Sequence, residues 1–179
     1  MLFVHKKSNY KSLPQFECWD EERDAFNYTG HAPIIAHPPC RLWSRLRAFT
    51  TAPDEERFLG IAAIDYVRMY GGVVEHPYDS GLFKKMGVPK PGFVDEYGGI
   101  FLVVDQFHFG YYIRKRTGLY IVGCSYADIP AQPLRMELVT RRFENLTKKQ
   151  RSETTLDFAL FLYEIWKKIN SNYGEKKKL

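Results

Sequence analysis

The chain has few cysteines and no long apolar run, and both shortages narrow the classes of protein that it can be. Its 179 residues include Cys18, Cys40 and Cys124, an odd number at wide separations that does not make a disulfide framework. No apolar stretch approaches the roughly 20 residues of a membrane-spanning helix. Residues 1–7 place charge directly after a very short apolar run, the reverse of a secretory signal. We expect a soluble protein of the reducing cytoplasm.

Several sequence fingerprints of nucleotide and metal chemistry are also missing. Residues 2–13 contain no glycine, so the chain does not open with a glycine-rich turn between a strand and a helix. The phosphate-loop and dinucleotide-binding fingerprints do not occur either. Cys40 is followed by Arg41, Leu42 and Trp43, and no H-x-E triplet is present, which argues against a zinc nucleobase deaminase.

The composition points to one folded domain with a basic surface. Hydrophobic residues make up 45% and aromatic residues 16% of the chain, enough for one sizeable core at this length. The formal charge of +5 favours a polyanionic partner. We assign residues 171–179, with their lysine run, to a disordered basic tail. Two other basic clusters suit phosphate contacts and base stacking by DNA. They are Arg41, Arg45 and Arg47, and Arg114, Lys115 and Arg116.

The segment around Cys40 is the most informative stretch of the chain. Residues 33–36 form an apolar run that predicts a short buried strand. Pro38 and Pro39 end that strand, because a proline cannot donate a hydrogen bond to the sheet. Cys40 therefore lies where a strand enters a loop. In an open α/β sheet this edge is where ligands bind, so a thiol there is accessible to a substrate.

A helix and a second strand follow this segment. The acidic residues 54–56 suit the start of a helix, and the glycine pair 71–72 suits its end. Residues 73–77 then predict a strand that again ends in proline. A right-handed crossover between parallel neighbours would place Cys40 and Glu75 on the same rim of the sheet.

The remaining pattern completes an α/β domain that spans residues 1–179. We expect a mostly parallel central sheet with flanking helices. The further expected elements are short strands at 2–5 and 16–19, a short helix at 80–86, a surface loop at 87–99, strands at 100–104 and 119–122 that suit a β-hairpin, and a final amphipathic helix capped by Ser152.

Three ordered motifs carry a resemblance to a known family. They are Ile34-Ile35-Ala36-His37-Pro38-Pro39-Cys40, then Val73-Val74-Glu75-His76-Pro77, then Gln106-Phe107-His108-Phe109-Gly110 with Arg114-Lys115-Arg116-Thr117-Gly118-Leu119-Tyr120. This order resembles the core motifs of DNA cytosine-C5 methyltransferases. It is more closely similar to short methyltransferase-like proteins of phages and prophages with PPC, E-N/H-P and Q-F-G signatures. The resemblance covers about half of the chain and implies a trimmed Rossmann-like methyltransferase fold.

The resemblance also implies a function, a phage-encoded DNA modification in the cytoplasm of the host cell. In that family the Pro-Cys thiolate attacks C6 of a flipped cytosine, a glutamate holds N3, and an arginine supports the base. Carried over to this chain, the catalytic residues are Cys40, Glu75, and Arg114 or Arg116. The expected nucleic-acid contacts are Arg41, Arg45, Arg47, Lys115 and Gln106.

The family's cofactor is S-adenosylmethionine, and here the chain departs from the pattern. Asp20, after the expected strand at 16–19, is the candidate acid for the ribose. The glycine-rich turn that admits the cofactor is missing, so we expect binding by the protein alone to be weak or absent. His76 stands where the family has asparagine, and no long insertion can form a separate target-recognition domain.

The proposed chemistry requires Cys40 to react as a thiolate. Attack on a pyrimidine needs a thiolate, so nearby cations must lower the Cys40 pKa from its usual value of about 8.5. Arg41, Arg45 and His37 are the candidates. A carboxyl group near the ring can share a proton with N3, which is the role left for Glu75.

Two alternatives remain open at this point. A catalytically silent methyltransferase-like protein would keep the scaffold to bind DNA or a host protein, for instance in counter-defence, and the missing glycine-rich turn favours it. A zinc-binding protein would use ligands of the types that zinc prefers. Those candidates are His37 and Cys40 together with His76, His108 or Cys124.

Overall fold

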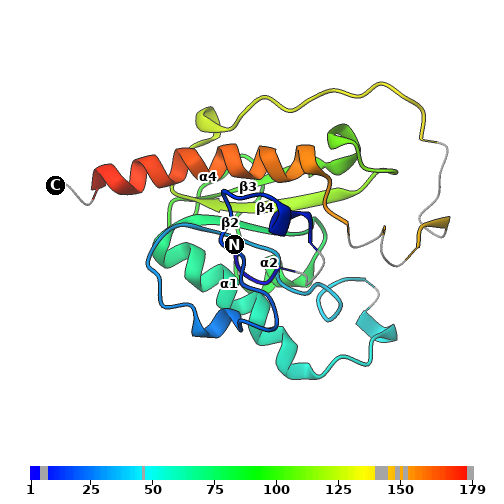
Figure 1. The fold of residues 1–179 in the computed structure, drawn as a ribbon, viewed down its shortest axis with the longest axis horizontal. Coiled ribbons are helices and arrows are strands. Elements are labelled where there is room, and N and C mark those ends of the chain that lie inside the picture. The colour runs from blue at the N-terminus through cyan, green and yellow to red at the C-terminus, as the bar shows by residue number, and fades with distance from the viewer. Residues whose placement is uncertain (5–7, 46, 140–144, 148–149, 151–152, 177–179) are drawn as a thin grey trace.

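The computed structural model describes residues 1–4, 8–45, 47–139, 145–147, 150 and 153–176. A four-stranded sheet lies between α1 and α2 on one face and α4 on the other (Figure 1). The strands are β1 (Ile34–Ala36), β2 (Gly72–Pro77), β3 (Gly99–Asp105) and β4 (Arg116–Val122), and the helices are α1 (Arg57–Tyr70), α2 (Gly81–Lys85) and α4 (Leu156–Lys176).

The sheet is mixed, so the prediction of a mostly parallel sheet is wrong. The strand order is β1-β2-β4-β3, and only the β1–β2 pair of these neighbours is parallel. β4 pairs antiparallel with both β2 and β3. The physical reason is the connection between β3 and β4, residues 106–115, because a parallel return needs a crossover of about a dozen residues or more. The predicted hairpin of these two strands is confirmed.

The reversal of β4 brings four strand ends to one edge. β1, β2 and β3 run in the same direction, while Thr117 of β4 pairs with Pro77, and Arg116 pairs with Asp105. The carboxyl ends of β1, β2 and β3 and the amino end of β4 therefore meet. Side chains from four separate stretches of the sequence converge at this carboxyl edge.

Alternation along the strands divides the core into two layers. Val73 and Leu119 pack with the layer under α4, whereas Val74 and Tyr120 pack with the layer against α1. This is the period of two expected of strands buried on both faces. Gly72 allows β1 and β2 to pair closely, since an added Cβ would lie 2.1 Å from the Ile34 carbonyl oxygen.

The N-terminal segment extends the sheet beyond β1 without forming a regular strand. Leu2 makes single parallel bridges to Ala36 and to Trp19. Its amide donates to the Ile35 carbonyl at 2.9 Å, and the Trp19 amide donates to the Met1 carbonyl at 2.9 Å. The strands expected at 2–5 and 16–19 are therefore present as isolated bridges, and residue 5 lies outside the described residues.

The predicted helices are confirmed, with shifted ends. α1 is preceded by a 3₁₀ turn over Asp54–Glu56 and ends at Gly71. Ser80 caps α2 by accepting from the Leu82 amide at 3.1 Å. No helix among the described residues is long and apolar enough to cross a membrane.

The C-terminal helix differs from its prediction at both ends. Thr155 Oγ1 accepts from the Phe158 amide at 3.4 Å at the start of α4, whereas the predicted cap Ser152 lies outside the described residues. α4 continues to Lys176, so residues 171–176 of the expected tail are helical. Residues 177–179 lie outside the described part of the chain.

Candidate active site at the carboxyl edge

A charged and hydrogen-bonded cluster occupies this carboxyl edge, with Glu75 at its centre. His37, directly after β1, places Nδ1 3.0 Å from Glu75 Oε2. Gln106, directly after β3, donates from Nε2 to Glu75 Oε1 at 3.1 Å and to Thr117 Oγ1 at 2.9 Å. The carboxylate is thus held from both sides by residues that lie far apart in the sequence. The first and second predicted motifs meet as expected.

Glu75 is kept in its charged form by these neighbours. Burial raises the pKa of its carboxyl group, but the hydrogen bond from His37 and the charges of His37 and Lys115 outweigh burial and leave the pKa below its usual value. Its side chain is 16% exposed. The site therefore presents a fixed negative charge, partly accessible to a ligand, at neutral pH.

The negative charge of Glu75 acts on the Cys40 thiol. Cys40 is exposed as a residue, while the protein packed around the thiol desolvates it and raises its pKa. The Glu75 carboxylate raises the pKa further, and Lys115 acts in the opposite direction. The thiol is therefore protonated at neutral pH in the free protein.

The arginines that were expected to activate this thiol are engaged elsewhere. Arg41 donates from Nε to Glu56 Oε1 at 2.7 Å, and Arg45 forms an ion pair with Asp79. Each positive charge is matched by a carboxylate next to it. The pKa of Cys40 is raised overall, with burial as the largest cause, so the expected lowering of its pKa is not observed.

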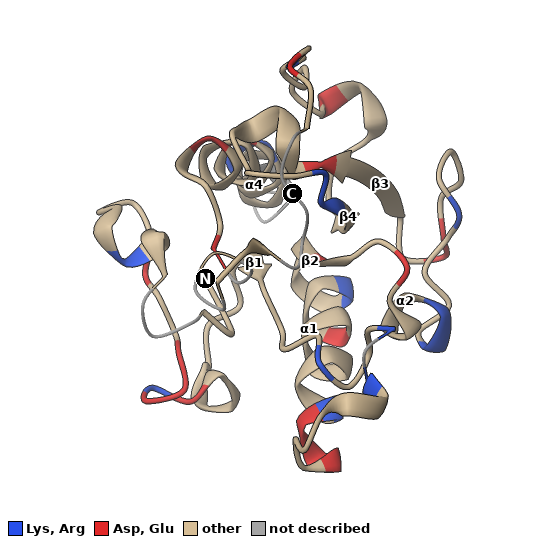
Figure 2. Cartoon of the chain, turned by 90° about the vertical axis from the view of Figure 1, so that its right-hand side faces the viewer, with Lys and Arg blue, Asp and Glu red and all other residues tan. Residues whose placement is uncertain are grey.

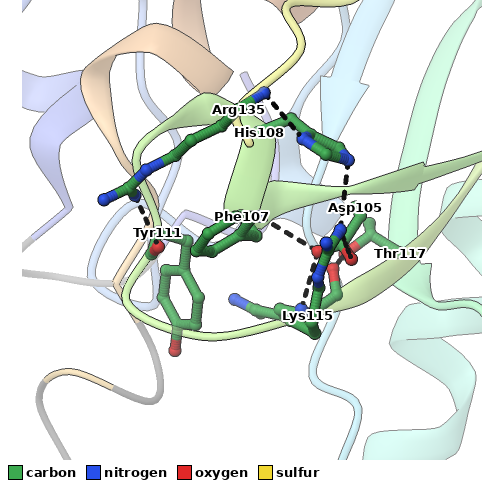
Figure 3. A network of polar contacts seen from close by, with 8 residues as sticks. Asp105, Phe107, His108, Tyr111, Lys115, Thr117 and Arg135 are labelled. Atoms are coloured by element: carbon green, nitrogen blue, oxygen red, sulfur yellow. Dashed lines mark hydrogen bonds and ion pairs between the residues drawn. The ribbon is translucent and has the colours of Figure 1, made fainter. Parts of the chain in front are cut away.

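In the third motif the residue that acts on Cys40 and Glu75 is Lys115. Lys115 lies just before β4 and is half-buried, whereas Arg114 and Arg116 on either side of it are exposed. The charges of Glu75 and Cys40 both act on the Lys115 amine, whose pKa is lowered by burial. Figure 3 shows this amine reaching toward the Tyr111 ring, 4.7 Å from the ring centroid.

The two predicted catalytic arginines have other contacts. Arg114 lies 3.3 Å from Asp105 and 4.7 Å over the Phe107 ring, and Arg116 lies 4.0 Å over the Tyr78 ring. Both residues are exposed at the surface. The structure does not bring either of them into the Glu75 cluster, and the basic residue of this motif whose charge acts on Glu75 is Lys115, between them.

Buried polar atoms without a protein partner surround the cluster. Among the residues that the structure describes, the hydroxyl of Tyr10, Nε2 of His37 and Oε1 of Gln106 have no hydrogen-bond partner. Tyr10 packs on the His37 ring with centroids 5.1 Å apart, and both Tyr10 and Gln106 are 1% exposed. A buried polar group left unpaired costs about 1–3 kcal/mol. Three of them at one edge indicate a place where a ligand or ordered water completes the bonding.

Sequence reasoning missed two members of this cluster. Tyr10 comes from a polar segment with no periodic signal, and nothing in its neighbourhood along the chain connects it to the motifs. Thr117 stands inside the third motif, two positions from Lys115, and could have been found by following strand alternation from Glu75 across the sheet. Gln106 was expected to contact nucleic acid, and it is buried inside the cluster.

His76 and the other zinc candidates do not build a metal centre. No group of three or more potential ligands that could hold a metal ion occurs in the described ranges. His76 is fully buried, and burial lowers its pKa to about 4. His108 Nδ1 accepts from the Arg135 amide at 3.1 Å (Figure 3), and Cys124 follows the far end of β4. The zinc alternative therefore has no support from the geometry.

Asp20, the residue that was expected to bind ribose, has a structural role. Asp20 forms an ion pair with Lys11, and its Oδ1 accepts from the amides of Glu22 and Arg23 at 3.1 and 3.2 Å. The hydrogen bond from Lys11 lowers the pKa of the carboxyl group. Asp20 stabilises a turn, and the residue is only 4% exposed, so it does not fit a ribose-binding role.

Two clefts in the structure lie away from this cluster. One, of about 210 Å³, is lined by residues that include Trp19, Tyr28 and Trp166. The other, of about 230 Å³, lies where α1 and β4 end and includes Arg68 and Gly123. Neither is lined by the residues of the Glu75 cluster. Charge and unpaired polar atoms, rather than hollow volume, locate the candidate site.

The expected DNA-binding surface is divided by acidic residues. Figure 2 shows basic and acidic segments side by side around α1. Arg47, in a 3₁₀ turn, is exposed, and Phe49 in the same turn is 85% exposed. Arg41, Arg45 and Arg114 each lie against a carboxylate. Three of the six basic residues of the two expected clusters are thus paired with carboxylates.

Comparisons with known proteins returned no match: no family model, no curated protein and no solved structure matches this chain.

Proposed function

We propose that the protein modifies a pyrimidine base of nucleic acid, in the manner of a cytosine-C5 methyltransferase, with Cys40 as its nucleophile. The observation that supports this proposal is the placement of the Cys40 thiol and the charged Glu75 at one strand edge, with Gln106 and His37 holding the carboxylate. A pyrimidine presents an electrophilic C6 and a basic N3 on the same ring. One thiol and one carboxylate at the same edge match these two atoms.

The covalent step uses only residues of this cluster. The thiol proton of Cys40 leaves to solvent, and the thiolate forms a bond from Sγ to C6. The electron pair of the C5–C6 double bond moves onto C5 and is delocalised toward N3. As charge develops at N3, a proton taken up from solvent is shared between N3 and the Glu75 carboxylate, and this stabilises the adduct. C5 then accepts a proton from solvent where no group donor is bound. Loss of the original C5 proton restores the C5–C6 double bond as the C6–Sγ bond breaks and the thiolate leaves.

S-adenosylmethionine does not fit the residues expected to hold it. Asp20 is engaged by Lys11 and by two amides, and residues 2–13 lack the glycines that let backbone approach a ligand. The proposal therefore concerns addition of the thiol to the base.

A second function is favoured by a different observation. The thiol is protonated in the free protein, and Arg41 and Arg45 are paired with carboxylates. Both features suit a catalytically silent protein that binds DNA or a host protein through the same scaffold. Such a protein would keep the edge geometry and show no chemistry at C5.

Hydrogen exchange at C5 separates the two functions without any methyl donor. Addition of a thiolate to C6 makes C5 take up a solvent deuteron, and elimination then leaves deuterium on cytosine. We expect oligonucleotide incubated with wild-type protein in D₂O to gain deuterium at C5, and Cys40→Ser to give none. A result of no exchange on single-stranded and duplex DNA alike would favour the silent binding protein.

A further inference from the structure

The loop between α2 and β3, residues 86–98, exposes two adjacent apolar side chains at its tip. Phe93 is 67% exposed and Val94 is 62% exposed. The first part of the loop is anchored to the protein, because Met86 and Val88 pack against the core layer on the α1 side of the sheet. A single exposed apolar side chain is ordinary in a soluble protein. This loop differs because its backbone is held firmly around the exposed pair.

Asp95 closes the loop and ties it to the sheet. Its amide donates to the Gly99 carbonyl at 3.0 Å, and its Oδ1 accepts from the amides of Tyr97 and Gly99 at 3.0 and 2.7 Å. Its Oδ2 accepts from the Tyr120 hydroxyl of β4 at 2.7 Å and lies 4.0 Å from the guanidinium of Arg68 on α1. One carboxyl group therefore fixes the turn that follows Phe93 and Val94.

Tyr126 fixes the other side of the tip. The Gly92 amide donates to the Tyr126 hydroxyl at 2.8 Å, and this hydroxyl donates to the Phe101 carbonyl of β3 at 3.0 Å. The Phe93 amide itself donates to the Lys90 carbonyl at 3.1 Å. The backbone on both sides of the exposed ring is thus fixed before any partner binds. A preorganised loop loses little conformational entropy on binding.

The same stretch carries an excess of positive charge. Lys84 and Lys85 at the end of α2 and Lys90 in the loop are all exposed. No ion pair within the described part of the chain involves these three lysines. Of the two acidic residues in residues 84–98, Asp95 is engaged by Tyr120, so Glu96 is the one exposed carboxylate. The charge of this surface is complementary to a polyanion.

We propose that residues 84–94 bind a single strand of nucleic acid, with the three lysines on phosphates and Phe93 stacked on a base. An aromatic ring beside basic side chains suits single strands of any sequence, because every base has a π-face. The tip lies next to the amino end of β3, where Val94 bridges to Ile100, and therefore away from the carboxyl edge that holds Glu75. This contact goes beyond the proposed function, since it depends on no reaction at Cys40.

Nucleic acid fits this surface better than a membrane does. It supplies regularly spaced negative charges and flat rings in one polymer, which match the lysines and the phenyl ring. A membrane anchor needs the broad apolar face of an amphipathic helix, whereas the tip presents Phe93 and Val94. An anionic membrane is therefore an alternative for the experiment to exclude.

Fluorescence anisotropy with a labelled oligodeoxythymidylate tests the contact over a range of salt concentrations. We expect Phe93→Ala to raise the Kd by about tenfold, as loss of one stacked base does, and to leave the salt dependence unchanged. Lys90→Gln should lower the slope of log K against log salt by about 0.7, the value for one phosphate of a single strand. Phe58→Ala on α1 is the matched control for the ring, since Phe58 is 61% exposed. Lys167→Gln on α4, where Lys167 pairs with Glu164, is the control for charge.

A second substitution separates stacking from folding. Phe93→Leu keeps an apolar side chain without a ring, so it should bind as weakly as Phe93→Ala, and thermal denaturation of both variants should give the wild-type Tm. Wild-type affinity in Phe93→Leu, or equal losses in Phe93→Ala and Phe58→Ala, would overturn the stacking contact. An unchanged salt slope in Lys90→Gln would overturn the phosphate contact.

Two further outcomes would decide between partners and between proposals. Absence of oligonucleotide binding at low salt, together with Phe93-dependent binding to phosphatidylserine vesicles, would overturn the inference in favour of a membrane. Oligonucleotide binding with the expected losses but no hydrogen exchange at C5 would support this surface and reject the pyrimidine chemistry. Exchange at C5 by a protein whose Phe93 and Lys90 variants bind like wild type would do the reverse.

Discussion

The Nδ1 atom of His37 lies 3.0 Å from Oε2 of Glu75 and joins the end of β1 to β2 across 38 residues of sequence. The parallel pairing of these strands makes the contact, since Ala36 pairs with Val74 and the two residues that follow lie side by side. Cys40 follows three residues after His37. The contact therefore ties Glu75 to the segment that leads to Cys40.

The close pairing of β1 and β2 depends on Gly72. Its φ is +133°, and a Cβ added there would lie 2.1 Å from the Ile34 oxygen, so no side chain fits. We expect Gly72→Ala to lower the free energy of unfolding by about 2–4 kcal/mol, measured by chemical denaturation. Gly174→Ala in α4, where nothing lies within 4 Å, should raise stability slightly, by about 0.5–1 kcal/mol. Equal effects of the two substitutions would contradict the pairing argument.

Acid should destabilise the protein through His76. Burial lowers its folded-state pKa from 6.5 to about 4, so the unfolded chain binds a proton more readily over this interval. The contribution is fully present above pH 6.5 and is lost as the pH falls toward 4, by up to about 3 kcal/mol. We expect His76→Leu to remove this part of the pH dependence in denaturation curves. His31→Asn, which removes an exposed imidazole, is the matched control, and a His76→Leu curve parallel to wild type would disprove the assignment.

Ion pairing at the surface should limit the affinity for DNA. Arg45 is 80% exposed at its side chain and paired with Asp79, so Asp79→Asn frees one cation near Cys40. We expect tighter binding to single-stranded or duplex DNA at low salt, and a salt dependence steeper by about one phosphate contact. Glu164→Gln makes the same change of net charge and frees Lys167 on α4. Equal gains from both variants would mean that only net charge matters, and would remove the case for a DNA surface beside Cys40.

Much of the fold follows from local signals in the sequence. The acidic turn before α1, the glycines that follow it and the apolar runs of β1 and β2 act within a few residues, and these elements lie where the pattern predicts. The insertion of β4 between β2 and β3 does not follow from such signals. It depends on which edge of the hairpin of β3 and β4 pairs with β2. Long-range packing decides this, and the alternation of residues along β4 is the same in either arrangement.

The candidate site likewise has features that the sequence predicts and features that it does not. The placement of Cys40 and Glu75 on one rim was predictable, because parallel neighbours present their carboxyl ends together. The choice of Lys115 over the flanking arginines was not, because the three basic residues are consecutive where a loop enters β4, and only the packing around them shows that Lys115 is the half-buried one. The partners of Arg41 and Arg45 are Glu56 and Asp79, and no spacing rule connects residues so far apart.

Covalent capture of Cys40 tests the central claim most directly. An oligonucleotide with 5-fluorocytosine should trap a nucleophile on C6, because fluorine cannot leave C5 as a proton does after group transfer. The assay compares wild type with Cys40→Ser and Glu75→Gln, with cell extract as the source of a group donor and with S-adenosylmethionine alone, which is not expected to suffice. We predict a denaturant-stable adduct of the wild-type protein whose modified peptide contains Cys40, and none with Cys40→Ser. Absence of any wild-type adduct under all of these conditions, or an adduct that persists in Cys40→Ser, would contradict the account.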